Sequence, residues 1–335
     1  MSTNTQLTET GTGQYVITFE REMKIVLHFG PHKTGTTAIQ SALGASREQI
    51  LKEHGIWYPE VASQGPGHAE WASKIAVADG RALNEITEEV VRAPSSIDCL
   101  LLSSENFIRL PESRIRELSL AFRQTGASEI TAAFTLTPYR RRFFSFWGEM
   151  VKHGWSLRFE DSLTALVSDP GIAPDSPLKA ARALQSDRVA ILMHQSTSPQ
   201  ANLAGQLLSV SGLGDIAVPT QLRLNQAAPL FVSELLCWMN DYLNKHVEAG
   251  HDRRALRGSL LAALNDSQRW QELLREISIT PPEVKGTFVR RIDQLVGEHI
   301  LCVERLETEM DCTIRGDKAW LDDTWPVEGF TAPFN

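Results

Sequence analysis

Four short, continuous apolar runs constrain the fold of this chain more than any other feature of its sequence. They occupy residues 24–30, 97–103, 130–136 and 188–193, and each has the length of a β-strand. Strands that are apolar on both faces are typical of a parallel sheet covered by helices on both sides. Apolar residues at helical spacing lie between and after these runs, at residues 38–51, 113–123, 139–152 and 202–210. The pattern predicts an α/β fold, a three-layer sandwich around a central parallel sheet.

The same pattern divides the chain. Residues 1–22 are polar, and we expect them to form a disordered tail. Residues 23–335 are predicted to form a single domain, because hydrophobic residues make up 42% of the chain and can build a sizeable core. Within it, residues 228–335 carry only helical patterns, at 229–245, 253–264, 270–277 and 285–310, which predict a mainly helical C-terminal cap.

Charge and composition argue against several classes of protein. The net charge of −8 disfavours a general binder of nucleic acid or of anionic membranes. The chain has no apolar run of about 18 residues, the length that a membrane-spanning helix needs, and its start lacks the pattern of a signal peptide. The four cysteines lack metal-ligand spacing, and Cys99 and Cys237 lie in apolar runs, as reduced core thiols do. We expect a cytoplasmic protein with no metal site and no nucleic-acid or membrane partner.

The first apolar run ends in a glycine-rich loop, Gly-Pro-His-Lys-Thr-Gly-Thr-Thr at residues 30–37, and a helical pattern follows. Such a unit directs backbone N–H groups and the positive end of a helix dipole at one anion. The spacing of Gly30 and Gly35 matches a Walker A loop, yet Thr36 stands where the Walker lysine belongs and Lys33 lies inside the loop. Lys33 would therefore lie over a shorter anionic chain than a triphosphate, at the second anionic centre beyond the ribose rather than at a γ-phosphate. The alternative is a turn without a ligand.

Residues 29–43, FGPHKTGTTAIQSAL, resemble the P-loop-like 5′-phosphosulfate loop of sulfotransferases that use 3′-phosphoadenosine 5′-phosphosulfate (PAPS), particularly the bacterial carbohydrate-type branch. The resemblance implies that Lys33 contacts the bridging oxygen and the sulfuryl group. It implies that the loop around it binds the cofactor, through Pro31, His32, Thr34, Gly35, Thr36 and Thr37. The reaction it implies is in-line sulfuryl transfer to a hydroxyl or amine, which leaves 3′-phosphoadenosine 5′-phosphate (PAP) and needs no metal. The acceptor would be a small molecule or glycan, and the branch favours a carbohydrate or glycoconjugate.

The 3′-phosphate of PAPS needs a second positive site. The third apolar run is followed by Thr-Pro-Tyr-Arg-Arg-Arg-Phe-Phe-Ser, residues 137–145, and proline favours a helix start. Arg141 and Ser145 then share one helix face, where a guanidinium and a hydroxyl can hold a phosphate. The family pattern R-P-x(6)-S fits at its proline and serine, but Thr137 replaces its arginine, so one of the arginines at positions 140–142 has to substitute. The alternative is an exposed basic helix face.

Two later segments extend the resemblance. Residues 150–163 resemble the family's glycine turn and the helix start that follows it. Residues 221–227 resemble an R-x-N-x-S segment that closes over the nucleotide. Arg223 and Asn225 match this segment, and Ala227 replaces its serine. The resemblance therefore adds Arg223 and Asn225 to the expected cofactor-binding residues.

The base that removes the acceptor's proton is expected at the carboxyl end of a strand beside the loop, where open α/β sheets bind ligands. The resemblance assigns this role to Glu105, just after the second apolar run; a Ser/Glu pair that caps a helix is the alternative. His68, in a Gly/Pro loop, is the rival base because histidine titrates near neutral pH; a solvated loop histidine is its alternative. His32 contacts the acceptor or orients the loop. Aromatic residues near His68 either offer faces to a sugar ring or fill the core: Trp57, Tyr58 and Trp71.

Two other functions stay open on the sequence alone. Thr137 and Ala227 depart from the family pattern at expected cofactor contacts, which allows a degenerate member that binds a nucleotide without catalysis. An ATP-dependent P-loop kinase is the second alternative, and the displaced lysine argues against it.

Overall fold

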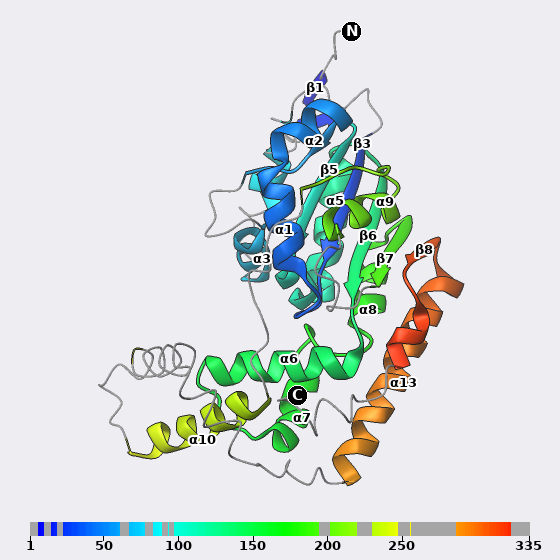
Figure 1. The fold of residues 1–335 in the computed structure, drawn as a ribbon. Helices are drawn as coiled ribbons and strands as arrows, with labels where there is room; N and C mark the ends of the chain where they lie inside the picture. Colours follow the sequence, from blue (N-terminus) through cyan, green and yellow to red (C-terminus); the bar gives the residue numbers. More distant parts are fainter. Residues whose placement is uncertain are drawn as a thin grey trace.

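The computed structural model describes residues 6–9, 15–18, 23–60, 67–77, 83–88, 93, 97–193, 202–219, 230–246, 255 and 286–322 of the chain. Its centre is a six-stranded sheet in which all neighbouring strands are parallel (Figure 1). The strands, in sheet order, are β4 (Ile56–Trp57), β5 (Cys99–Ser104), β3 (Met23–Phe29), β6 (Ala127–Leu136), β7 (Arg188–Met193) and β8 (Cys312–Arg315). The predicted α/β fold is confirmed, and the four apolar runs form β3, β5, β6 and β7.

The two edge strands lie outside the apolar runs. β4 has only two residues beside β5, and β8 is partly exposed, so neither carries the continuous apolar run of a strand buried on both faces. β8 also places a strand within residues 228–335, for which the sequence predicts mainly helices.

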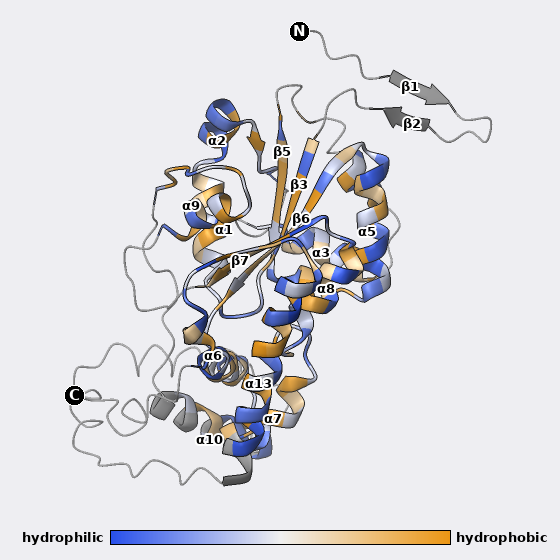
Figure 2. Ribbon diagram, turned by 90° about the vertical axis from the view of Figure 1, so that its right-hand side faces the viewer, coloured by the Kyte–Doolittle hydropathy of each residue, from blue (hydrophilic) through white to orange (hydrophobic). Residues whose placement is uncertain are grey.

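Helices cover both faces of the sheet (Figure 2). Leu27 of β3 packs on the side of α3 (Ala69–Ala76), α5 (Glu112–Gln124) and α8 (Ser176–Leu184). Its neighbour Val26 packs on the side of α1 (Thr36–Ala45), α2 (Arg47–His54) and α9 (Leu203–Val210). Because successive side chains of a strand point to opposite faces, each strand contributes to both cores. The sheet and the helices on its two faces therefore form three layers.

The helix predicted over residues 38–51 is two helices. α1 ends at Ala45, and the N–H of Ser46 bonds to the carbonyls of Ala42 and Leu43 at 3.1 and 3.2 Å before α2 begins. The apolar spacing continues across this break because Leu43 of α1 and Ile50 of α2 pack into the same core. The spacing therefore identified the buried face but not the break.

A group of helices lies beyond the carboxyl ends of the strands (Figure 1). α6 (Tyr139–Lys152) follows β6 directly and packs with α7 (Phe159–Val167), α10 (Leu230–His246) and α13 (Gly286–Glu309). Their shared core is rich in aromatic residues, including Phe143, Trp147 and Phe159. Since β3 and β6 run parallel, the loop after β3 emerges at the same edge of the sheet as the start of α6. This arrangement positions the site described below.

Three further findings concern the N-terminal residues, the apolar character of the helices and the cysteines. Within residues 1–22, where the sequence predicts a disordered tail, β1 (Gln6–Glu9) and β2 (Tyr15–Thr18) pair antiparallel. No described helix combines the length and the apolar character needed to cross a membrane. All four cysteines are free thiols, and Cys99 and Cys237 are buried, which confirms them as core residues.

Candidate functional site

The glycine-rich loop joins β3 to α1 at the carboxyl edge of the sheet. Lys33 and Gly35 both have left-handed backbone conformations, with φ of 66° and 85°; for a residue other than glycine this costs about 1–2 kcal/mol. Gly30 is required for another reason, because a Cβ there would lie 1.7 Å from Cγ2 of Thr36. The chain thus turns sharply into α1. The N–H groups of Ala38 and Ile39 donate to the carbonyl of Gly35 at 3.1 and 3.3 Å, and those of Thr36 and Thr37 precede the first bonds of the helix.

Two hydrogen bonds hold the loop in shape. The hydroxyl of Thr34 donates to the carbonyl of Pro31 at 2.7 Å, and the N–H of His32 donates to the carbonyl of Gly171 at 3.2 Å. Thr34 is fully buried, so its hydroxyl serves the loop itself rather than a ligand. This narrows the prediction for Thr34 to its backbone N–H. Pro31 has no N–H and its carbonyl accepts from Thr34, so its part is to shape the loop.

Lys33 extends from the loop to α6, where its Nζ lies 2.9 Å from Oε2 of Glu149. Lys152 and His153, near the end of α6, approach the same carboxylate, with nitrogen–oxygen distances of 3.6 and 3.4 Å. Partial burial would raise the pKa of Glu149, but the hydrogen bond and charge of Lys33, with Lys152 and His153, outweigh it and lower that pKa. The carboxylate is therefore charged at neutral pH, and it pairs with a loop lysine and two groups of its own helix.

Glu105 follows β5 directly and reaches the start of α1. Its Oε2 accepts a hydrogen bond from the hydroxyl of Thr36 at 2.7 Å, and its Oε1 lies 3.9 Å from Nδ1 of His32. Glu105 also begins the short 3-10 helix η1 (Glu105–Arg109), but Ser104 caps that helix by accepting from the N–H of Asn106. The capping role thus belongs to Ser104, and the structure brings Glu105 together with the loop.

The ring of His32 extends from the loop and packs against α6. Its ring stacks on Phe146 with the centroids 5.1 Å apart, and a Cβ at Gly171 would lie 2.3 Å from its Cδ2. Its Nε2 is buried and has no hydrogen-bond partner among the residues that the structure describes. Burial, with the charge of Arg109, lowers the pKa of His32 to about 4, so the ring is neutral at pH 7. This tight packing favours the interpretation that His32 orients the loop.

His68 lies in the core rather than in a solvated loop. Its Nε2 is 3.2 Å from the carbonyl of Pro59, and its Nδ1 accepts from the N–H of Ser103 at 3.0 Å. The ring packs against Tyr58 and Trp71, at 4.7 and 5.5 Å between centroids. Both nitrogens are therefore used, and burial lowers the pKa of His68 to about 4. The aromatic residues predicted to face a sugar are buried as well: Trp57, Tyr58 and Trp71.

The three arginines at the start of α6 have different environments. Arg140 donates to Asp293 of α13 at 2.6 Å, and Arg142 is buried and donates to a backbone carbonyl after α7 at 3.0 Å. Arg141 and Ser145 are half-buried and lie one turn apart on the same face of α6. Arg140 and Arg142 are buried and connect elements of the fold, and Arg141 is the arginine that shares a helix face with Ser145, which makes it the candidate to substitute for the arginine missing at Thr137.

A buried polar network crosses the sheet next to the loop. His28 of β3 is fully buried, with Nδ1 2.8 Å from the hydroxyl of Ser103 and Nε2 2.6 Å from that of Thr135. The side-chain amide of Gln40 donates to the same serine hydroxyl at 3.4 Å. Burial lowers the pKa of His28 to about 3, so the ring is neutral. The network ties β5, β3 and β6 together near the ends from which Glu105 and the loop emerge.

Two features of the site have no counterpart in the sequence analysis. Glu149 lies four residues after Ser145, so the same i, i+4 spacing that pairs Arg141 with Ser145 could have identified it. The second is the turn after α7, where Asp169 accepts from Nε of Arg109 at 3.0 Å and from the N–H of Gly171 at 2.8 Å. No local sequence pattern marks this turn as a neighbour of His32. Arg223 and Asn225 lie outside the described residues.

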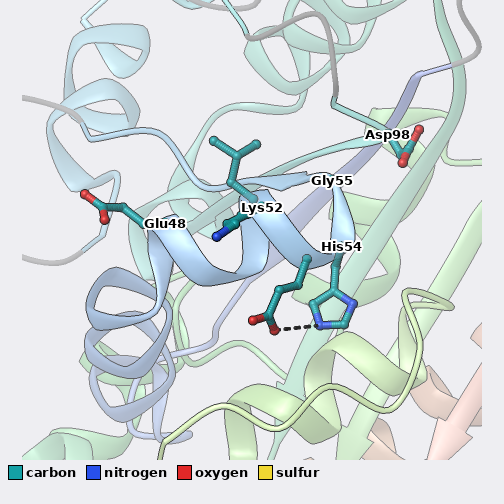
Figure 3. A pocket seen from close by; sticks show the side chains of 7 residues that line it. Glu48, Lys52, His54, Gly55 and Asp98 are labelled. Atoms are coloured by element: carbon teal, nitrogen blue, oxygen red, sulfur yellow. Dashed lines mark ion pairs between the residues drawn. The ribbon is translucent and has the colours of Figure 1, made fainter.

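A surface hollow lies at the opposite edge of the sheet (Figure 3). Its lining comes from α2 and from the residues just before β4 and β5: Glu48, Leu51, Lys52, Glu53, His54, Gly55 and Asp98. Gly55 and Asp98 precede strands, so the hollow is at the amino ends of the strands, whereas the loop is at their carboxyl ends. It contains none of the predicted site residues.

The candidate site therefore comprises the loop, Glu105 after β5, and the face of α6 that carries Arg141, Ser145 and Glu149. Within the described part of the chain, no three His, Cys, Asp or Glu side chains gather as a metal ion would need. No protein-family model matches this chain, and a search of curated proteins also gave no match.

Proposed function

We propose that this protein is a sulfotransferase that passes the sulfuryl group of PAPS to a hydroxyl or amine of an acceptor, a carbohydrate or glycoconjugate. The position of Lys33 carries the proposal. The loop joins a central parallel strand to a helix start, as in a P-loop, but its lysine lies two residues before Gly35 in a left-handed conformation. A Walker lysine would stand at Thr36, where α1 begins.

The donors of the loop fit the 5′ phosphosulfate of PAPS. The first turn of α1 carries no acidic residue, so the helix dipole and its N–H groups favour an anion there. Lys33 adds a charged donor, and Thr36 and Thr37 add hydroxyls at the start of the helix. PAPS supplies an activated sulfuryl group, and these residues of the chain would bind and orient it.

The 3′-phosphate is assigned to α6. Arg141 and Ser145 offer a guanidinium and a hydroxyl from one half-buried helix face, whereas Arg140 and Arg142 are buried. Arg223 and Asn225 complete the proposed nucleotide site on the resemblance alone.

Glu105 is the proposed base, because its carboxylate lies beside the loop whereas both nitrogens of His68 are used in the core. Glu105 takes the proton that the acceptor loses as its oxygen or nitrogen bonds to sulfur. In the same step Lys33 stabilises the negative charge that gathers on the bridging oxygen as the bond from sulfur to that oxygen breaks. The leaving product is PAP.

The test is thermal stabilisation of the full chain by PAP, compared with ADP and with ATP, each with and without Mg²⁺. A ligand that binds only the native state stabilises it by about 2.7 kcal/mol at a hundred times its Kd, which raises Tm by several degrees. We expect a metal-independent rise with PAP that exceeds the rise with ADP and is strongly reduced in Lys33→Ala. Lys179→Ala, on the exposed side of α8, is the control, since Lys179 pairs with Asp175, the residue that precedes the same helix.

A response to ATP with Mg²⁺ but not to PAP would replace the proposal with a P-loop kinase. Binding of PAP without transfer of labelled sulfate to any of a panel of sugars, phenols and amines would favour the degenerate, non-catalytic alternative.

A further inference from the structure

The contact between Lys33 and Glu149 is the most informative feature of the site that the proposed function leaves unexplained. It joins the loop to α6 across 116 positions of sequence, with Nζ and Oε2 2.9 Å apart. Among the carboxylates that the structure describes, Glu149 alone lies within ion-pair distance of Lys33. The side chains are 27% and 32% exposed, so the pair is shielded from water in part and is stronger than a fully exposed one.

The pair is unequal, because Glu149 has two further partners, whereas Lys33 pairs with Glu149 alone among the described residues. Lys152 and His153 lie one helical turn after Glu149, at 3.6 and 3.4 Å from its carboxylate, so their backbone positions do not depend on Lys33. Loss of Lys33 would therefore leave no isolated charge on α6. Lys33 can move from Glu149 to another anion at a modest cost in free energy, because the new anion then pairs with the lysine in place of the carboxylate.

A second carboxylate occupies the loop in the same way. Thr36 donates to Glu105 at 2.7 Å, so the loop's charged side chain and one of its hydroxyls are both bonded to carboxylates of the protein itself. A phosphosulfate that used these groups would have to displace both contacts. The two glutamates thus occupy the donors that we assign to the ligand.

We propose that Glu149 is a positioning residue. Its carboxylate holds the side chain of Lys33 against α6 and competes with the anionic end of PAPS or PAP for that side chain; this proposal rests on the proposed function. When the ligand binds, Lys33 leaves Glu149 for the ligand, and Glu149 remains paired with Lys152 and His153. Glu149 therefore weakens nucleotide binding while it keeps the lysine beside the loop.

The experiment is a double-mutant cycle on PAP binding by the full chain, measured by calorimetry for wild type, Glu149→Gln, Lys33→Ala and the double variant. Glu149→Gln keeps the shape of the side chain and removes its charge, so we expect PAP to bind about three-fold tighter or more. In the Lys33→Ala background the same substitution should change the affinity by much less, because the competition acts only through that lysine. Glu149→Asp keeps the charge but shortens the side chain, and we expect it to resemble Glu149→Gln.

Each outcome bears on a different claim. Equal tightening in both backgrounds would show a general charge effect and overturn the role of Glu149. Unchanged or weaker PAP binding in Glu149→Gln, with normal binding by wild type, would also overturn it and leave the sulfotransferase proposal intact. Failure of wild type to bind PAP would overturn the proposed function and the competition together.

Discussion

The hydroxyl of Thr36 has a single proton, which it donates to Glu105. A phosphate that accepts this hydrogen bond displaces the carboxylate of Glu105. The displaced carboxylate can then accept a proton from the sulfuryl acceptor. Lys33 likewise donates to Glu149, and a ligand that pairs with Lys33 must displace that carboxylate. The state of the site therefore depends on whether Thr36 and Lys33 donate to the two glutamates or to a bound ligand.

The first residue-scale prediction concerns Glu105. Glu105→Gln should lower the rate of sulfuryl transfer by about 10²–10⁴-fold, the usual contribution of a general base. Glutamine keeps an acceptor for Thr36 but loses the charge that competes with the anionic ligand, so PAP affinity should not fall. Transfer is measured at saturating PAPS, and PAP affinity by calorimetry. Glu112→Gln, at the exposed start of α5, removes a carboxylate charge as well and serves as the control. Transfer at the wild-type rate by Glu105→Gln would rule Glu105 out as the base.

Residue types alone predicted part of this site. The lysine, glycines and threonines of the loop are consecutive, so their chemistry was readable without a structure. Glu105 was readable because it directly follows a strand, where the family resemblance places the base. His68 was misread, because a Gly/Pro neighbourhood does not reveal that Tyr58 and Trp71 close over the ring. Glu149 was overlooked because its meaning depends on Lys33, which lies 116 positions away.

At the scale of elements, the strands buried on both faces were predictable because burial on both faces requires apolar residues throughout. The four apolar runs match β3, β5, β6 and β7 to within a few residues. β4 and β8 were not predictable in this way, since a strand at the edge of a sheet or of two residues needs no such run. The end of α1 at Ala45 was also hidden: Gly44 stands beside it, but the apolar spacing runs on from Leu43 to Ile50 across the break.

Two glycines provide an element-scale prediction. Gly30→Ala places a methyl group against Thr36 at the junction of β3 and α1, and should lower the free energy of unfolding by about 1–3 kcal/mol. It should also weaken PAP binding, because Thr36 has to move. Gly297→Ala, inside α13 with no atom within 4 Å of the added Cβ, should raise the free energy of unfolding by about 1 kcal/mol. Urea denaturation measures both. Equal effects of the two substitutions would contradict the close approach at Gly30.

At the scale of the whole molecule, buried histidines set the response to pH. His28, His68 and His299 are almost fully buried, and burial lowers their pKa values to about 3, 4 and 3. In the unfolded chain each returns to an ordinary value of about 6.5. The unfolded state therefore binds more protons than the folded state between these values, so stability falls as the pH falls through that window.

We expect the free energy of unfolding to drop by several kcal/mol between pH 7 and pH 5, since each such histidine contributes up to about 1.4 kcal/mol per pH unit. Urea denaturation at a series of pH values measures the slope. His68→Asn should flatten it, whereas His54→Gln, on the exposed end of α2, should leave it unchanged. A stability that is constant from pH 7 to pH 5 would mean that these histidines are not kept neutral by burial.

The position of β8 has a consequence for the order in which the chain can be completed. β8 pairs with β7, yet α9, α10 and α13 lie between them in the sequence. A ribosome that has made β3 to β7 has therefore produced a sheet whose β7 side is still an open edge, with unpaired N–H and C=O groups. That edge stays open until synthesis passes Arg315. The nascent chain must either shield it with a chaperone or delay the closure of the sheet until β8 has been made.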